Sequence, residues 1–251
     1  MKKYLTAPLV LLFLAAVISG QDSSTGKANG PVTTNTPAIV VSAITPNSTP
    51  IELARAALAA QGGDKFKNLK SMMLVGSVDL YPPNSAQSIP GKFAMVTAGD
   101  RVRIDIDARP IFAFKQIYDG QQSFSSIPGV QMPPASKFGL PVLAKFDQPG
   151  YTVSGLPDKK KLRGFRVVDV DGNTTDFYLD PATGRVIMYL IPYQGYTFGT
   201  ENSKMKEVEG VLIPFSFTQR LETAQGAFFA EYKVKDVKLN QPLGADVFAI
   251  Q

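Results

Sequence analysis

Residues 101–107 read Arg-Val-Arg-Ile-Asp-Ile-Asp, and this stretch decides the fold. Charged and branched aliphatic side chains alternate in it without a break, which is typical of a strand with one buried face. The turn sequence at 98–100 separates it from a second strand pattern at 92–97, in which Phe93 and Met95 share one face. Because the turn is short, the two segments are predicted to pair antiparallel.

The same period of two continues in both directions along the chain. Further strands are predicted at residues 72–80, 111–118, 122–126, 151–156, 162–170, 175–179, 185–191, 198–207, 211–221 and 227–239. Turn residues separate them, among them Asp171-Gly172-Asn173 and Glu209-Gly210. No strand–helix–strand repeat occurs, so the sequence predicts a mainly β fold with minor α and about eleven or twelve antiparallel strands.

One helix is predicted ahead of the strands. Thr49 and Glu52 have the spacing of a capping box, and Pro50 stands at the first helical position. Apolar residues follow at helical spacing until Gly62-Gly63, where the helix is expected to end. We expect this helix to pack one face on the sheet.

The strand pattern is interrupted at residues 127–150. This stretch holds five prolines together with several large apolar side chains, which is unusual for a loop of such length. A short helix is possible at 141–146, with proline in its first position. We interpret the stretch as a flap that covers an apolar surface.

The first 49 residues have the composition of an export segment and a linker. Residues 1–20 combine a basic start, Met1-Lys2-Lys3, with an apolar stretch and then small residues, as in a signal peptide. An uncleaved anchor is the alternative, although the apolar stretch is shorter than the ~20 residues that span a membrane. Residues 21–49 are predicted to be a disordered linker, and residues 50–251 the folded domain. The expected location is the periplasm or the exterior.

The composition narrows the possible chemistry. The chain contains no Cys and no His, which removes thiolate nucleophiles, disulfides and the usual zinc ligands. The net charge of +5 falls to +3 without Lys2 and Lys3, and the basic residues are spread out, so nucleic acid is not an expected partner. No catalytic motif is present. We therefore predict a protein that is not an enzyme and has no catalytic residues, metal or cofactor.

Several turn and strand-end motifs together resemble those of a known family. They are Tyr118-Asp119-Gly120, the segment from Phe177 to Gly184, Gly210-Val211-Leu212-Ile213-Pro214, and the ending from Leu239 to Phe248. In this order, the chain resembles the outer-membrane lipoprotein-sorting (LolA/LolB-like) superfamily over roughly residues 50 to 251. The resemblance implies a strongly curved antiparallel sheet, an open half-barrel, whose concave apolar cavity holds a lipid or a lipoprotein acyl chain.

Large apolar side chains on one face of the predicted strands, with others in the flap, are the candidate ligand-binding residues. Phe and Met suit such a cavity because they are large and polarisable. The alternative is that they form an ordinary filled core. The candidates are Phe93, Met95, Ile104, Ile106, Phe112, Phe114, Met132, Phe138, Leu140, Leu143, Phe146, Phe177, Leu179, Met188, Leu190, Phe215 and Phe217.

Three polar patterns have both a functional and a plain interpretation. Asp169, Asp171 and Asp176 suggest an oxygen-ligand calcium loop, but the spacing favours a hairpin turn. The charged face of residues 101–107 could pair carboxylates for catalysis, although a solvated outer face is favoured. Residues 159–161, three lysines, could touch anionic head groups, but a solvated hairpin tip is the simpler interpretation.

The sequence as a whole favours a periplasmic carrier or sensor for a lipid, an acyl chain or another apolar ligand. The alternative is a non-catalytic interaction or structural module of the cell envelope with a filled core. Besides the lipid, an envelope protein partner and peripheral membrane contact are possible. A carboxylate-based hydrolase is the least favoured hypothesis.

Overall fold

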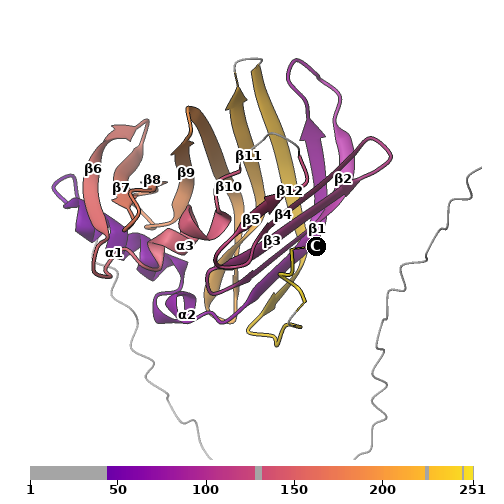
Figure 1. Ribbon diagram of the computed structural model, residues 1–251. Helices are drawn as coiled ribbons and strands as arrows, with labels where there is room; N and C mark the ends of the chain where they lie inside the picture. Colours follow the sequence, from indigo (N-terminus) through magenta and orange to yellow (C-terminus); the bar gives the residue numbers. More distant parts are fainter. Residues whose placement is uncertain (1–43, 128–131, 224–225, 245, 251) are drawn as a thin grey trace, which may run out of the picture. The chain divides into compact units, whose positions relative to one another are not determined.

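One continuous antiparallel sheet forms the body of the protein. The computed structural model describes residues 44–127, 132–223, 226–244 and 246–250, and the predicted signal peptide lies outside them. Twelve strands belong to the sheet within the described residues, and the sheet curves without closing (Figure 1). This confirms the predicted fold class, a mainly β open half-barrel.

The strands follow the alternating sequence pattern closely. Their bounds are β1 Met72–Tyr81, β2 Ile89–Ala98, β3 Arg101–Ala108, β4 Phe112–Tyr118, β5 Ser123–Ser125, β6 Thr152–Lys159, β7 Leu162–Val168, β8 Thr174–Leu179, β9 Val186–Tyr193, β10 Tyr196–Val208, β11 Val211–Thr223 and β12 Gly226–Leu239.

The strand order joins two meanders. It runs β5-β4-β3-β2-β1-β12-β11-β10-β9-β8-β7-β6, so β1 pairs with β12 in the middle of the sheet. The two edge strands, β5 and β6, are consecutive in the chain but lie at opposite ends of the sheet. The segment between them must therefore cross the whole width of the half-barrel.

The helices are few and short. They are α1 Pro50–Gln61, α2 Asp64–Lys67, the 3-10 turn η1 Ala135–Lys137 and α3 Leu140–Leu143. The capping box is present, since the backbone N–H and the hydroxyl of Thr49 both donate to Glu52 Oε2, at 2.7 and 2.9 Å. Helix α1 ends at Gly62, as predicted, and packs on β6 and β7. Within the described part of the chain, no helix combines the length and apolar character needed to cross a membrane.

Residues 44–49, which we expected in the linker, pack on the folded unit. Ile44 contacts the apolar residues around α1. The guanidinium of Arg163 donates to the carbonyl oxygen of Thr45, and at 3.4 Å to that of Ser48. This short stretch therefore belongs to the domain.

Two apolar clusters lie on the concave face of the sheet. The sheet cluster joins β1–β4 with β11 and β12, and Leu74, Phe93, Phe217 and Tyr232 are among its buried members. The helix cluster joins α1 and α3 with β7, β8 and β9 around Phe165 and Phe177, whose rings stack with their centroids 5.1 Å apart. The two clusters divide the half-barrel into two halves.

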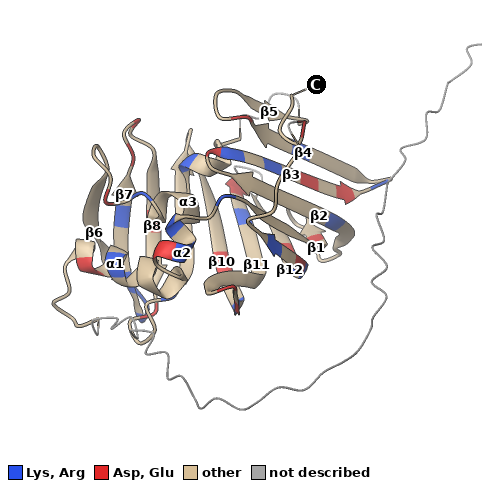
Figure 2. Ribbon diagram, turned by 90° about the horizontal axis from the view of Figure 1, so that it is seen from below, with Lys and Arg blue, Asp and Glu red and all other residues tan. Residues whose placement is uncertain are grey.

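A third, outer cluster covers the opposite face of β1–β5. Val96, Ile117 and Phe248 are buried there together. On this face Arg103 pairs with Asp105 and donates to the carbonyl oxygen of Val247 at 3.1 Å. The charged face of β3 (Figure 2) was expected to be solvated; the C-terminal segment instead covers part of it, and the side chain of Arg103 is only 29% exposed.

Candidate functional site

The predicted flap is a strap across the concave face. We define the strap as residues 132–147, which include η1 and α3; residues 128–131 of the predicted flap lie outside the described part. Gln116 of β4 donates through Nε2 to the carbonyl oxygen of Pro133 at 2.8 Å. The backbone N–H of Gly139 donates to Thr175 Oγ1 on β8 at 3.1 Å. The strap is thus attached to both meanders.

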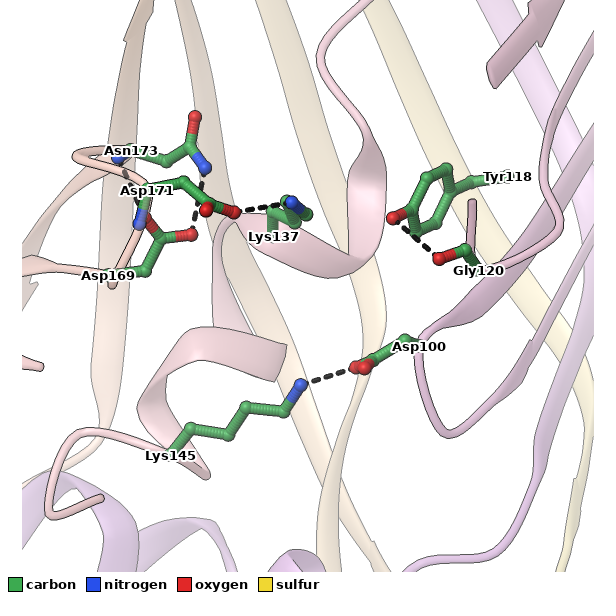
Figure 3. Close-up of polar contacts among 8 residues, drawn as sticks. All are labelled: Asp100, Tyr118, Gly120, Lys137, Lys145, Asp169, Asp171 and Asn173. Atoms are coloured by element: carbon green, nitrogen blue, oxygen red, sulfur yellow. Dashed lines mark hydrogen bonds and ion pairs between the residues drawn. The ribbon is translucent and has the colours of Figure 1, made fainter. Parts of the chain in front are cut away.

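Three ion pairs fasten the strap at its margins. Lys137 pairs with Asp171 in the β7–β8 turn at 2.5 Å, and Lys145 pairs with Asp100 in the β2–β3 turn (Figure 3). Lys67 of α2 pairs with Asp147 at 2.7 Å. The hydrogen bond from Lys67 holds the pKa of the Asp147 carboxyl below its ordinary value, and that to Asp171 raises the pKa of Lys137.

The apolar side chains of the strap are mostly buried. Phe138 and Phe146 are each only 3% exposed, and Leu143 is completely covered. Phe146 and Leu143 belong to the helix cluster, which Leu140 flanks. Phe138 meets the ring of Tyr193 edge-on, with centroids 5.7 Å apart. The strap therefore does cover an apolar surface, and it fills the helix-cluster half of the half-barrel.

The sheet-cluster half is less completely covered. Phe93, Ile106, Phe114 and Phe217 are buried in it. Around them lie predicted ligand residues that are only partly buried: Met95, Ile104, Phe112, Met132 and Phe215. This half therefore presents large apolar side chains that remain partly exposed, on a concave surface.

Two of the candidate residues lie on the other face. Cross-strand partners point to the same side of a sheet. Phe177, on the concave face, is paired with Tyr189. Met188 is paired with Tyr178 and Leu190 with Asp176, so both point to the opposite face. The register shifts between Tyr178 and Leu179, so Leu179, opposite Val186, stays within the helix cluster. Grouping Met188 and Leu190 with the concave residues was wrong, because this irregularity changes the phase of β9.

Polar residues of the concave face were not among the predicted site residues. Thr200 and Asn202 on β10 are 6% and 5% exposed, and Tyr232 on β12 is 3% exposed. Burial raises the pKa of the Tyr189 and Tyr232 hydroxyls, and a side-chain hydrogen bond with Thr200 opposes that rise at Tyr189. The only sign of Thr200 and Asn202 in the sequence is that a polar residue stands at a strand position where the alternation predicts an apolar one.

The carboxylates suggested for calcium are engaged by the protein itself. Asp169 accepts hydrogen bonds from the backbone N–H groups of Asp171 and Asn173 and from Asn173 Nδ2, at 2.8–2.9 Å (Figure 3). Asp176 is held by Arg166 at 2.6 Å. Asp169, Asp171 and Asn173 therefore build a hairpin turn, and no group of three or more Asp or Glu in the described residues is placed to hold a metal ion.

The motif Tyr118-Asp119-Gly120 also has a structural role. The Tyr118 hydroxyl donates to the carbonyl oxygen of Gly120 at 2.9 Å (Figure 3). The Asp119 carboxylate accepts from the backbone N–H groups of Gln122 and Gln121, which lowers its pKa. These bonds define the turn from β4 to β5. Lys159 ends β6, and Lys160, with φ +58°, occupies the hairpin tip as the simpler interpretation expected.

An open antiparallel half-barrel with a strap across its concave face is a LolA-like fold. A crystal structure of a LolA superfamily protein from Nitrosomonas europaea covers 81% of this chain and 98% of its own length, with a TM-score of 0.55 and 11% identity. That likeness confirms the fold implied by the turn motifs, and at this identity it concerns the fold alone.

Two further solved structures are similar to lower degrees. A putative outer membrane lipoprotein-sorting protein domain from Vibrio parahaemolyticus covers 78% of this chain and 97% of its own, with a TM-score of 0.49 and 12% identity. A DUF1329 family protein from Desulfovibrio piger covers 80% and 98%, with a TM-score of 0.47 and 8% identity. No family model matches the sequence, and no curated protein matches it significantly.

Proposed function

We propose that this chain is an exported binding protein of the bacterial envelope that holds a lipid, an acyl chain or a similar apolar ligand against the sheet cluster. The observation that carries the proposal is the set of partly exposed Met and Phe side chains on a concave surface. Ligand sites of proteins are typically concave and lined mainly by large apolar side chains. The proposal involves no catalysed reaction.

The LolA-like fold supports the proposal as an analogy. The Vibrio parahaemolyticus structure carries the description of a lipoprotein-sorting protein, and the signal-peptide pattern of residues 1–20 is consistent with a periplasmic location. Site chemistry must decide the ligand, because one fold can support many functions. The side chains that the sheet cluster presents are large and apolar, which suits hydrocarbon rather than a sugar or an ion.

A first experiment tests whether the chain carries a lipid at all. The full chain is expressed in a bacterium, recovered from the periplasm and extracted with organic solvent, and the extract is analysed by mass spectrometry. We expect near-stoichiometric phospholipid, lipoprotein acyl chain or fatty acid. A stable, lipid-free protein that also fails to bind added fatty acids and added long-chain alcohols would contradict the proposal.

A second experiment locates the ligand with two methionines. Met95 and Met188 are both half-buried strand residues, but Met95 flanks the sheet cluster and Met188 faces the other side. We expect Met95→Glu to weaken binding of a fluorescent fatty acid at least tenfold, because it puts a charge among apolar side chains. Met188→Glu is the matched control and should bind nearly as well as the wild type. Equal losses in both variants would place the ligand elsewhere.

The helix cluster favours a second candidate, a non-catalytic interaction module of the envelope. Phe165, Phe177 and Leu143 have no exposed surface, so this half is a filled core. If the sheet cluster is likewise covered, by a protein partner, the chain should capture a specific envelope protein and carry no lipid. Crosslinking in the periplasm followed by mass spectrometry distinguishes the two candidates.

A further inference from the structure

Asn202 lies where the two concave clusters meet. In the register of the sheet it stands opposite Phe217 of β11, and Phe217 stands opposite Tyr232 of β12. Both aromatic partners belong to the sheet cluster, where their rings stack with centroids 4.6 Å apart. Cross-strand partners point to the same side of a sheet, so the Asn202 side chain on β10 (Figure 1) points to the concave face, as that of Phe217 does.

One hydrogen bond fixes the orientation of the Asn202 amide. Nδ2 donates to the backbone carbonyl oxygen of Val186, a residue of the helix cluster, at 3.0 Å. A carbonyl oxygen can only accept, so the group facing it must be the NH2 group and not Oδ1. The opposite orientation would bring two acceptors together, and Oδ1 therefore points away from Val186.

The oxygen of this amide has no partner among the described residues. Oδ1 is shielded from solvent and accepts no hydrogen bond, and the residue as a whole is 5% exposed. The one other buried side-chain atom of the described residues in this condition is Ser136 Oγ, on the strap. A buried acceptor without a donor is destabilising, and such groups are rare enough in folded proteins to need an explanation. An apolar residue of similar size at position 202 would avoid this destabilisation.

We propose that Asn202 Oδ1 is the polar anchor of the ligand site: it accepts a hydrogen bond from a neutral hydroxyl or amide N–H of an otherwise apolar ligand. This inference rests on the proposed function and narrows its ligand class to neutral amphiphiles. Val186, Phe217 and Tyr232 offer no ionised group, so a charged head group would lose its hydration there without compensation. Because Oδ1 is enclosed, the ligand must part the side chains around it to reach it.

The test compares ligands that differ only in the donor. The full chain is titrated by calorimetry with 1-dodecanol, dodecanamide and dodecyl methyl ether, the last of which has the same apolar chain and no donor. We expect a compound with a donor to bind roughly 3- to 10-fold more tightly than the ether, as one buried hydrogen bond implies. Tighter binding of 1-dodecanol would indicate that the natural ligand donates from a hydroxyl, and tighter binding of dodecanamide that it donates from an amide N–H.

The variant Asn202→Leu keeps the volume and removes the acceptor. We expect it to bind the ether as well as the wild type does and to lose the preference for a donor. Asn202→Val, which also lacks an acceptor, is a second variant in case the first does not fold, and the same loss of preference is expected of it. A further measurement needs no variant. In NMR spectra of the wild type, the resonance of the Asn202 side-chain amide should shift when the alcohol is added and stay in place when the ether is added.

The outcomes distinguish failure of the Asn202 anchor from failure of the proposed binding function. Binding of alcohol, amide and ether with equal affinity, or a preference that survives in Asn202→Leu, would overturn the anchor and leave the proposed function standing. Binding of none of the three compounds would overturn both. A donor preference that disappears in Asn202→Leu would support both.

Discussion

Gly76 shows how closely single residues control the centre of the sheet. An added Cβ at this position would lie 2.0 Å from the carbonyl oxygen of Lys233 and 2.8 Å from the ring of Phe93. The register between β1 and β12 shifts between Val75 and Gly76, which brings the two strands unusually close there. Only a residue without a side chain fits, because the nearest atom is backbone.

We therefore expect Gly76→Ala to lower the free energy of unfolding by about 1–3 kcal/mol, the range for overpacking a filled site. The matched control is Gly155→Ala on the edge strand β6, where the nearest atom to an added Cβ is 3.5 Å away. This control should be neutral or slightly stabilising, because alanine costs less backbone entropy than glycine. Equilibrium unfolding in urea measures both, and a neutral Gly76→Ala would contradict the close approach.

At the scale of single residues, the sequence predicts well which apolar side chains are buried, but it does not predict which polar side chains are buried with them. Phe93, Ile106, Phe177 and Phe217 were expected on one face, and all four are buried on the concave side. Asn202 was overlooked because a polar residue in a strand ordinarily indicates the solvated face. Its role depends on the hydrogen bond to Val186, a contact across 16 positions of sequence that no local pattern predicts.

At the scale of elements, the strap depends on its ion pairs. The pKa of Asp147 is lowered by Lys67, so the carboxylate is favoured in the folded state. A group whose folded pKa is lowered stabilises the fold above its unfolded pKa, and this contribution disappears as the pH falls through the folded value. The pair contributes fully above pH 3.8, the ordinary value for this carboxyl, and fades below it.

We expect Asp147→Asn to lower the free energy of unfolding at pH 7 by about 0.2–1 kcal/mol, as is typical for a solvent-accessible pair. The difference from the wild type should shrink steadily as the pH is lowered below 3.8. Asp236→Asn, at an exposed position on β12, is the control. Urea unfolding between pH 2.5 and pH 7 checks the prediction, and a difference independent of pH would show that the pair does not stabilise the strap.

Element boundaries were predictable where the chemistry is local. The segment 101–107 corresponds to β3 Arg101–Ala108, and the capping box predicted the start of α1. The strap was anticipated from its prolines and apolar residues, but the partners of its charged side chains were not. Lys137 and Lys145 pair with Asp171 and Asp100, which are 34 and 45 positions away in sequence.

At the scale of the whole molecule, the β1–β12 pairing holds the two meanders together. Ten residues of β1 pair with β12, and α1, from the N-terminal part of the chain, packs on β6 and β7 of the C-terminal part. A cut in the chain between the two meanders therefore leaves these contacts intact.

We expect a protease site placed between Ile127 and Met132 to yield two fragments that stay associated. The cleaved protein should elute as one species under native conditions and separate into two in urea, as judged by gel filtration. The same site inserted at the exposed residue Gly172, in the turn between β7 and β8, is the control, because cleavage there cuts an ordinary hairpin. Spontaneous separation after cleavage at the first site would contradict the strength of the central pairing.

The order of the strands lay beyond local patterns. Short turns predicted the two meanders, because adjacent strands in the sequence become neighbours in the sheet. The contact between β1 and β12 joins strands about 160 positions apart, and only the resemblance to a half-barrel family suggested a single curved sheet. The face of Met188 was misassigned for a separate, local reason, because the irregularity in the β8–β9 pairing has no sequence signature.

The two edges of the open sheet bear on how the protein behaves at high concentration. Unpaired edge strands can recruit other chains and start aggregation. Here β5 is three residues long, and β6 contains Pro157, which has no N–H to donate, followed by Asp158 and Lys159. Each edge of the open sheet is therefore poorly suited to pairing with a strand of another chain.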